Sequence, residues 1–205
     1  MRRHSNVSLA IIAGGRGSRL SGIPKGLLTY DGRSVVSRLL DLQALVSEVL
    51  LVSNEPSPYA SFALRTVADV IPNRGAPGGL HAALVHARTE WVLAVGCDMP
   101  FIVPAVAELI LSARAADEQI VAFEINGRLE PLLALYHSAI AGAWGAALSP
   151  QPSFRDIFQL FRVRLLSEEM LRAVDPSMRA IVSINTPADL AQFGVKLPAS
   201  TPSVP

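Results

Sequence analysis

The sequence predicts an α/β fold in which a mostly parallel sheet is covered by helices on both faces. Short apolar runs rich in β-branched residues alternate with segments of helical period, and this alternation is typical of a parallel sheet. The 205 residues, half of them hydrophobic, suit one compact domain with a full core. A glycine-rich loop and Asp98 both follow predicted buried strands. Both therefore lie at the carboxyl ends of strands, which is where ligands bind to parallel sheets.

The first half of the chain predicts four strands. The run at 7–13 is apolar and bounded by glycines, which favours a buried parallel strand. Residues 34–46 have a helical period, with Ser34 in the N-cap position. The remaining elements expected here are strands at 48–54, 64–71 and 91–96, a short helix within 55–63, a helix at 79–90 and a helix beginning near Pro104.

The second half predicts two strands joined by a turn at Asn126-Gly127. We then expect helices at 138–149 and 153–161, a strand at 180–186, and a closing helix at 187–194 capped by Thr186. One domain is therefore expected over residues 1–195. The Pro- and Ser-rich segment 196–205 is expected to be a disordered tail.

Composition narrows the classes of function. The net charge of +1 and pI of about 8.0 give no support for a nucleic-acid-binding stripe. Cys97 is the single cysteine, so an internal disulfide is excluded and a reducing compartment is expected. The apolar run near the N-terminus is too short to span a membrane and leads into a poor cleavage region. We expect a cytoplasmic protein with neither a nucleic-acid nor a membrane partner.

The stretch "SLAIIAGGRGSRLSGIPKGLLTYDG" (8–32) raises the question of phosphate binding. A P-loop is excluded because Lys25 is followed by Gly26 instead of Ser or Thr. A dinucleotide fingerprint fits poorly because Leu20 stands where its third glycine belongs. The remaining hypothesis is a loop whose backbone N–H groups bind a triphosphate, with Arg16, Arg19 and Lys25 adding positive charge. A carboxylate at Asp98 could then hold Mg²⁺, as needed for displacing pyrophosphate.

Five segments, in order from residue 9 to 193, resemble the MobA family of molybdenum cofactor guanylyltransferases. They are "IIAGGRGSRLSGIPKGLL", "GAPGGLHAAL", "VGCDMPF", "EPLLALYH" and "SINTPADL". The first and third alone would indicate only a sugar-nucleotide type of nucleotidyltransferase. Together the five indicate a MobA-like protein.

The resemblance implies a Rossmann-like three-layer domain of the nucleotide-diphospho-sugar transferase type. It implies transfer of GMP from Mg²⁺-bound GTP to molybdenum-bound molybdopterin, with release of pyrophosphate. Other proteins of molybdenum cofactor biosynthesis, or cofactor chaperones, are implied as further partners. The N-terminal half would hold GTP and Mg²⁺, and the C-terminal half the acceptor. The implied GTP-binding residues are Ile12, Ala13, Gly14, Gly15, Lys25, Asn54, Asn73 and Asp98; the implied catalytic residues are Lys25, Asp98 and Arg19, with Asp98 as metal ligand.

The acceptor phosphate needs cations, for which Arg128 and Arg155 are candidates, and Asn185 is a further candidate contact. One departure concerns Asn73, which stands where we expect the family's acid after the third strand, so guanine selection should be weaker. Three alternatives remain open: the same chemistry with another base or acceptor, as in a cytidylyltransferase; a non-catalytic GTP- or cofactor-binding protein; and, for Asp98 itself, a simple helix cap.

Overall fold

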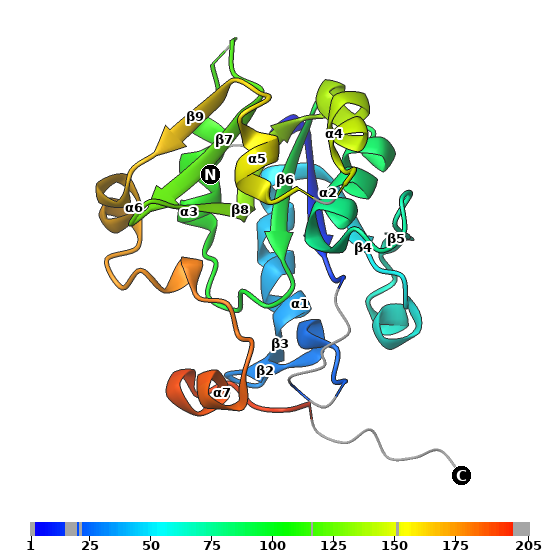
Figure 1. The fold of residues 1–205 in the computed structure, drawn as a ribbon. Helices are drawn as coiled ribbons and strands as arrows, with labels where there is room; N and C mark the ends of the chain where they lie inside the picture. The colour runs from blue at the N-terminus through cyan, green and yellow to red at the C-terminus, as the bar shows by residue number, and fades with distance from the viewer. Residues whose placement is uncertain (1–2, 15–19, 21, 116, 151, 199–205) are drawn as a thin grey trace.

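The computed structural model describes residues 3–14, 20, 22–115, 117–150 and 152–198. Its centre is a seven-stranded sheet of order β5-β4-β1-β6-β8-β7-β9 (Figure 1). β8 is antiparallel to both of its neighbours, and the other strand pairs are parallel, which confirms the expected fold class. The strands are β1 (His4–Ile12), β4 (Val46–Val52), β5 (Arg65–Val67), β6 (Trp91–Gly96), β7 (Ile120–Ile125), β8 (Arg128–His137) and β9 (Val163–Leu166).

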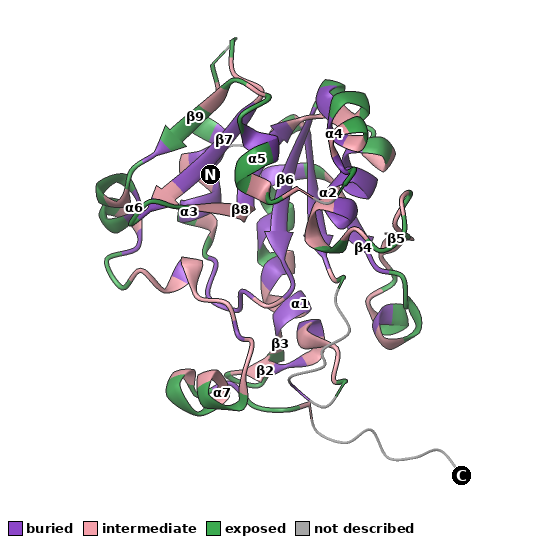
Figure 2. Cartoon of the chain, viewed as in Figure 1, coloured by how far each residue is buried: buried purple, intermediate pink, exposed green. Residues whose placement is uncertain are grey.

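Helices cover both faces of the sheet, giving three layers. One apolar cluster joins the sheet to α1 (Val35–Leu39), α3 (Pro104–Ser112) and α6 (Glu168–Val174). The other joins it to α2 (Gly75–His86), α4 (Ala141–Ala147) and α5 (Phe154–Phe158). The central strands are buried along most of their length, whereas the outer surfaces of the helices are exposed (Figure 2).

Smaller elements complete the chain. A hairpin of β2 (Thr29–Tyr30) and β3 (Arg33–Ser34) lies beside α7 (Pro187–Phe193), away from the main sheet (Figure 1). The 3₁₀ helices are η2 (Lys25–Leu27), η3 (Leu40–Leu45), η4 (Ser57–Phe62), η5 (Ser138–Ile140) and η6 (Arg179–Ile181).

The local signals read from the sequence are confirmed where polar groups cap helices or turn the chain. The side chains of Ser34, Ser153 and Thr186 accept hydrogen bonds from the backbone N–H groups at the starts of α1, α5 and α7. Asn126 and Gly127 have φ values of 50° and 72°, as a tight two-residue hairpin turn requires.

Several elements differ from the expectation. The strand predicted at 180–186 is wrong: residues 179–181 form η6, and residues 182–186 belong to no strand of the sheet. Ala180 and Ile184 are buried for another reason, since both belong to the apolar core and Ile184 lies beside the loop after β6. β9 and α6 were not predicted. The helix expected at 79–90 occupies Gly75–His86, and the helix expected at 34–46 continues from Leu40 as η3.

The C-terminal segment returns to the hairpin. Lys196, placed in the expected tail, exchanges two backbone hydrogen bonds with Thr29, of 2.7 and 2.8 Å. Residues 199–205 of that tail lie outside the described part of the chain.

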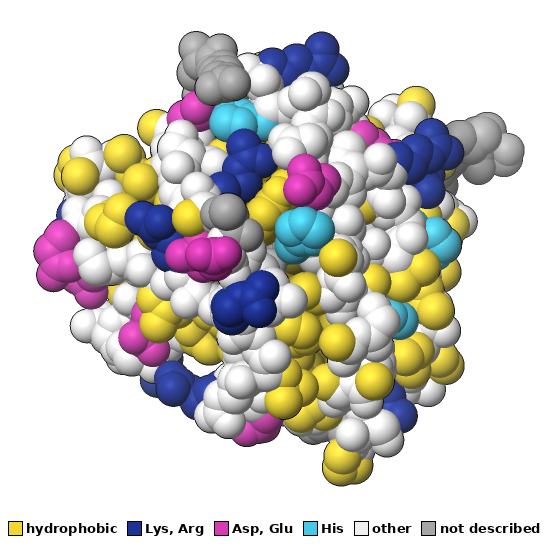
Figure 3. Space-filling model, turned by 90° about the horizontal axis from the view of Figure 1, so that it is seen from above, with side chains coloured by type: hydrophobic (Ala, Val, Ile, Leu, Met, Phe, Trp, Pro, Cys, Tyr) yellow, Lys and Arg dark blue, Asp and Glu magenta, His cyan; other side chains and the backbone are white. Residues whose placement is uncertain are grey.

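No helix among the described residues is long and apolar enough to cross a membrane. On the face seen from above, charged side chains of both signs are interspersed (Figure 3).

Candidate active site

A cleft of about 760 Å³ lies beyond the carboxyl ends of the parallel strands. Its walls come from the loops that follow β1, β4, β5 and β6, which is the edge where the sequence predicted a ligand. The described residues that line it are Ala13, Gly14, Gly22, Pro24, Lys25, Ser53, Asn54, Glu55, Pro58, Tyr59, Asp69, Asn73, Gly75, Ala76 and Cys97.

Lys25 lines this cleft and contacts Asp98 and Asn185, which are not among the lining residues. The Lys25 ammonium donates to Asp98 Oδ2 at 3.0 Å and to Asn185 Oδ1 at 2.5 Å. The Lys25 and Asp98 side chains retain 23% and 21% exposure, so both groups remain open to a ligand. We call these three residues the Lys25 cluster.

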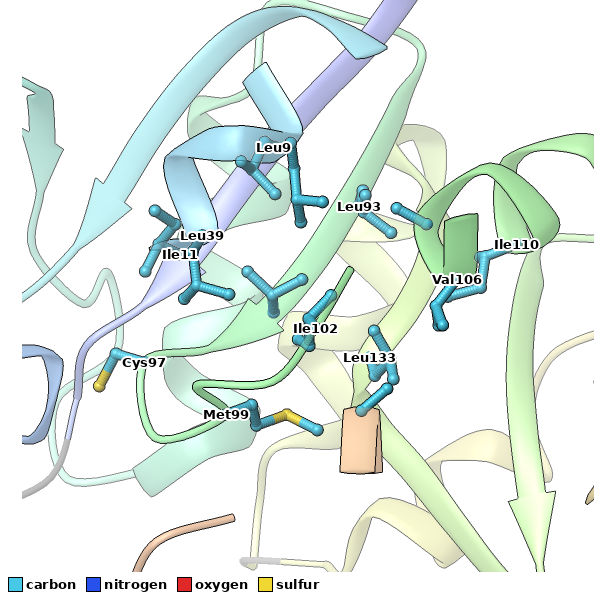
Figure 4. Packing of buried hydrophobic residues seen from close by; sticks show 14 of the residues in the cluster. Leu9, Ile11, Leu39, Leu93, Cys97, Met99, Ile102, Val106, Ile110 and Leu133 are labelled. Carbon is cyan, nitrogen blue, oxygen red and sulfur yellow. The ribbon is translucent and has the colours of Figure 1, made fainter. Parts of the chain in front are cut away.

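The core holds Asp98 in place. Cys97 and Met99, on either side of it, belong to the apolar cluster under the loop after β6 (Figure 4). The Cys97 amide donates to Ile12 O, and the Asp98 carbonyl accepts from the Ile184 amide. The helix-cap hypothesis for Asp98 is wrong, because α3 begins later, with Val103 at its N-cap. Burial raises the pKa of the Cys97 thiol to about 12, so it is not a thiolate nucleophile.

Lys25 owes its position to tight packing of the next residue. Gly26 is buried, and a Cβ there would lie 2.8 Å from the Tyr59 ring and from a methyl group of Val36. Any larger residue would have to displace η2 from α1 and η4, or displace the Tyr59 and Val36 side chains. The "PKG" sequence therefore has a steric reason, with Pro24 extended at φ −61° and Gly26 allowing close approach.

Asn185 is held by the start of α7. Asp189 Oδ2 accepts from the backbone N–H groups of Asn185 and Thr186, both at 2.8 Å. These hydrogen bonds lower the pKa of the Asp189 carboxyl, and the one from the Asn185 backbone has the largest effect. From the sequence, Asn185 was a candidate contact to the acceptor substrate, and the structure places its side chain against Lys25.

A second polar group lies on the opposite rim. Asn54 Nδ2 donates to Asp69 Oδ2 at 2.8 Å, and the Asp69 amide donates to Asn54 Oδ1 at 2.9 Å. Asp69 was missed by the sequence reasoning, although it stands two residues after β5 ends at Val67. An acid therefore follows β5 and lines the cleft together with Asn73, and the assignment of Asn73 to the position of the family's acid stays a prediction. Asn73 also lines the cleft, with φ 61°, just before α2.

Other predicted site residues lie elsewhere. The Ile12 side chain is buried against α2 and does not line the cleft. Arg155 donates to Gly127 O at 2.5 Å, beside the β7–β8 turn, and neither it nor Arg128 lines the cleft. Gly15 and Arg19, with Arg16 and Gly17, lie outside the described residues.

The donor set fits a metal ion that arrives with a nucleotide. Among the described residues no three His, Cys, Asp or Glu side chains gather to form a closed site. Asp98 offers one carboxylate oxygen beside the Lys25 ammonium, at 3.0 Å. Mg²⁺ in triphosphate sites is held by one or two carboxylates together with substrate phosphates and water, and a single carboxylate such as Asp98 is compatible with a site of that kind.

Comparison with known proteins gives sequence relatives. The profile of the MobA-like NTP transferase domain matches residues 9–168. A molybdenum cofactor guanylyltransferase of Vibrio cholerae is 31% identical over 200 residues, covering 95% of this chain and 94% of that protein. A Clostridium perfringens protein named "Probable molybdenum cofactor guanylyltransferase" is 34% identical, but the match covers 63% of this chain and 65% of its length.

A solved structure shows the same fold. The molybdopterin-guanine dinucleotide biosynthesis protein A of Archaeoglobus fulgidus superposes with a TM-score of 0.77 at 24% identity, covering 90% of this chain and 95% of that one.

Proposed function

This chain belongs to the MobA-like NTP transferase family, and we propose that it transfers GMP from GTP to molybdenum-bound molybdopterin. The observation that carries the proposal is the Lys25 cluster, which lies at the strand-end cleft beside the described part of the glycine loop. The cytoplasmic location and further protein partners expected from the sequence stay predictions.

The triphosphate end of GTP would lie between the glycine loop and Lys25. Ala13 and Gly14 line the cleft there, and the backbone N–H of Ala13 donates a hydrogen bond to Val52 O at 2.8 Å. Lys25 supplies a positive charge that can leave Asp98 and Asn185 for a phosphate oxygen. Gly15, Arg16 and Arg19 follow directly in sequence and remain proposed contacts.

The chemistry needs positioning more than a reactive side chain. A phosphate oxygen of the acceptor attacks the α-phosphorus of GTP, a P–O bond forms, and the bond to the departing pyrophosphate breaks. Lys25 neutralises the charge that develops on the phosphates. Mg²⁺, with Asp98 as its protein ligand, would supply further neutralisation of the triphosphate. Direct attack by the acceptor phosphate needs no covalent enzyme intermediate, and the buried Cys97 thiol takes no part in it.

The base and ribose would lie toward the other rim. Asp69 offers a carboxylate held by Asn54, and Asn73 is nearby on the same wall. A carboxylate can accept from both N1–H and N2–H₂ of guanine. This arrangement supports guanine selection more strongly than Asn73 alone.

The acceptor would approach the Lys25 cluster from the side of the C-terminal segment. Asn185 supports this placement because it faces Lys25. Arg128 and Arg155 remain weaker proposals, since they lie at the β7–β8 turn outside the lining of the cleft.

A substrate-specificity assay distinguishes a guanylyltransferase from a cytidylyltransferase and from a non-catalytic GTP-binding protein. Pyrophosphate release is measured with GTP, CTP or ATP, each with and without molybdenum-bound molybdopterin. We expect release only with GTP and acceptor together. Preference for CTP would indicate a cytidylyltransferase, whereas tight GTP binding without turnover would indicate a binding protein.

A further inference from the structure

Arg179 in η6 contacts the three chain segments that carry Lys25, Asp98 and Asn185, and we propose that it is a positioning residue that holds the Lys25 cluster in register. This inference rests on the proposed function of the cluster. It concerns a side chain that none of the sequence motifs contains.

The Arg179 guanidinium contacts three partners. Its Cζ lies 3.8 Å from the centroid of the Phe101 ring and 5.3 Å from that of Tyr30. One terminal nitrogen donates to the Tyr30 hydroxyl at 3.4 Å, and the other donates to the Phe193 carbonyl at 3.5 Å. No carboxylate of the described residues forms an ion pair with Arg179, so aromatic faces and a carbonyl surround its charge.

Each partner belongs to the segment that carries one member of the cluster. Tyr30 lies in β2, five residues after Lys25. Phe101 lies three residues after Asp98, in the loop that follows β6. Phe193 is the last residue of α7, the helix that begins just after Asn185.

The Phe101 ring also packs against the rings of Tyr30 and Phe193. Tyr30 meets Phe101 edge-on at 4.9 Å between centroids, and Phe101 meets Phe193 at 5.9 Å. In Figure 1 the orange chain descends from α6 through η6 to α7, beside β2. The guanidinium therefore connects three pieces of chain that are distant in sequence.

The chemistry suits arginine better than lysine. A planar guanidinium stacks on a ring and donates from its edge at the same time, whereas an ammonium cannot do both. If this contact is lost, the segment carrying Asn185 is held less firmly against the loop of Asp98. The short bond from Lys25 to Asn185 then lengthens, and small misplacements of catalytic groups slow reactions strongly.

Lysine labelling reads this effect without any assay of transfer. Lys25 and Lys196 are the two lysines of the chain, and Lys196 is exposed, so it serves as an internal reference. Acetylation by a small anhydride is followed at both sites by mass spectrometry. In Arg179→Met we expect the ratio of Lys25 to Lys196 labelling to rise about threefold or more, because the cluster opens more often.

Kinetics give the second readout. Arg179→Met should lower kcat for guanylyl transfer by about tenfold to a hundredfold, with a smaller change in KM for GTP. Arg179→Lys keeps the charge near Phe101 and should recover part of the loss. The control is Arg172→Met in α6, whose guanidinium pairs with Glu168 and should leave both readouts unchanged.

Two results are decisive. If Arg179→Met lowers the melting temperature but leaves the labelling ratio and kcat at wild-type values, Arg179 only stabilises the fold and the inference is wrong. If the wild-type protein transfers no guanylyl group, the proposed function fails. The labelling ratio would still report whether Arg179 positions the cluster.

Discussion

Lys25 is the residue whose charge the proposed chemistry needs most. Lys25→Ala should lose about 2–4 kcal/mol of transition-state stabilisation, by analogy with removal of an oxyanion donor. Stability should change little, because the ion pair with Asp98 is partly exposed. Lys196→Ala is the matched control, since that lysine lies outside the cleft. Steady-state kinetics and a thermal melt on each variant test this, and full activity of Lys25→Ala would remove Lys25 from the mechanism.

Substitution of Asp98 should remove activity and leave the stability of the fold nearly unchanged. Because it caps no helix, Asp98→Asn should abolish Mg²⁺-dependent turnover while the melting temperature stays close to that of the wild type. A metal titration of turnover and a melt on the same sample check both halves. A variant that keeps its Mg²⁺ dependence would show that another group binds the ion.

Asp69 and Asn73 are competing candidates for recognition of the base. Asp69→Asn should weaken GTP binding by about tenfold, since a charged acceptor is replaced by a neutral one. The sequence alone predicts instead that Asn73→Asp tightens the complex. Titrating GTP and ATP against both variants decides between them. If neither variant changes the GTP-to-ATP ratio, backbone groups select the base.

At the scale of the element, the capping box of α7 should matter for activity as well as for stability. Asp189 binds the amide of Asn185, whereas Asp156 makes the equivalent box at α5, away from the cleft. Asp189→Ala and Asp156→Ala should each lower the melting temperature by about 2–4 °C. Only Asp189→Ala should also reduce kcat. Equal activity of the two variants would mean that Asn185 keeps its place without the cap.

The same box predicts a pH dependence. Its hydrogen bonds lower the pKa of Asp189 below its ordinary value. Its stabilisation is therefore complete above about pH 5 and is lost as the pH falls through the lowered folded-state pKa. Melts of the wild type and Asp189→Ala should differ at neutral pH and converge in acid. A difference that persists in strong acid would contradict this.

Elements with a strong local signal were predictable, and those set by distant contacts were not. The strand at Trp91–Gly96 and the cap at Thr186 are visible in the sequence because burial and side-chain hydrogen bonding act locally. β9 is a short edge strand whose Leu165 is 47% exposed, so its pattern is weak. The strand predicted at 180–186 failed because Ile184 pairs with the loop of Asp98 and not with a strand.

At the scale of the whole molecule, the candidate site joins the two ends of the chain. Lys25 and Asp98 were predictable because both follow strands of one sheet. Their contact with Asn185 was not, because a C-terminal segment outside the sheet carries it. Asp69 could have been found as an acid just beyond a strand, had the end of β5 been placed correctly.

Metal dependence should likewise be a property of the enzyme–nucleotide complex. With no closed metal site among the described residues, a chelator should stop turnover without lowering the melting temperature of the free protein. Mg²⁺ should raise that temperature only when GTP is present. Stabilisation by Mg²⁺ alone would indicate a site built entirely from protein groups.

The most direct measurement follows the α-phosphate of GTP. The protein is incubated with GTP labelled at the α-phosphorus, Mg²⁺ and molybdenum-bound molybdopterin, and the products are separated. We predict that the label moves into a molybdopterin guanine dinucleotide, that one pyrophosphate is released for each transfer, and that Lys25→Ala suppresses both. Label that stays in GTP or appears only as free GMP would contradict the assignment of guanylyl transfer to this cleft.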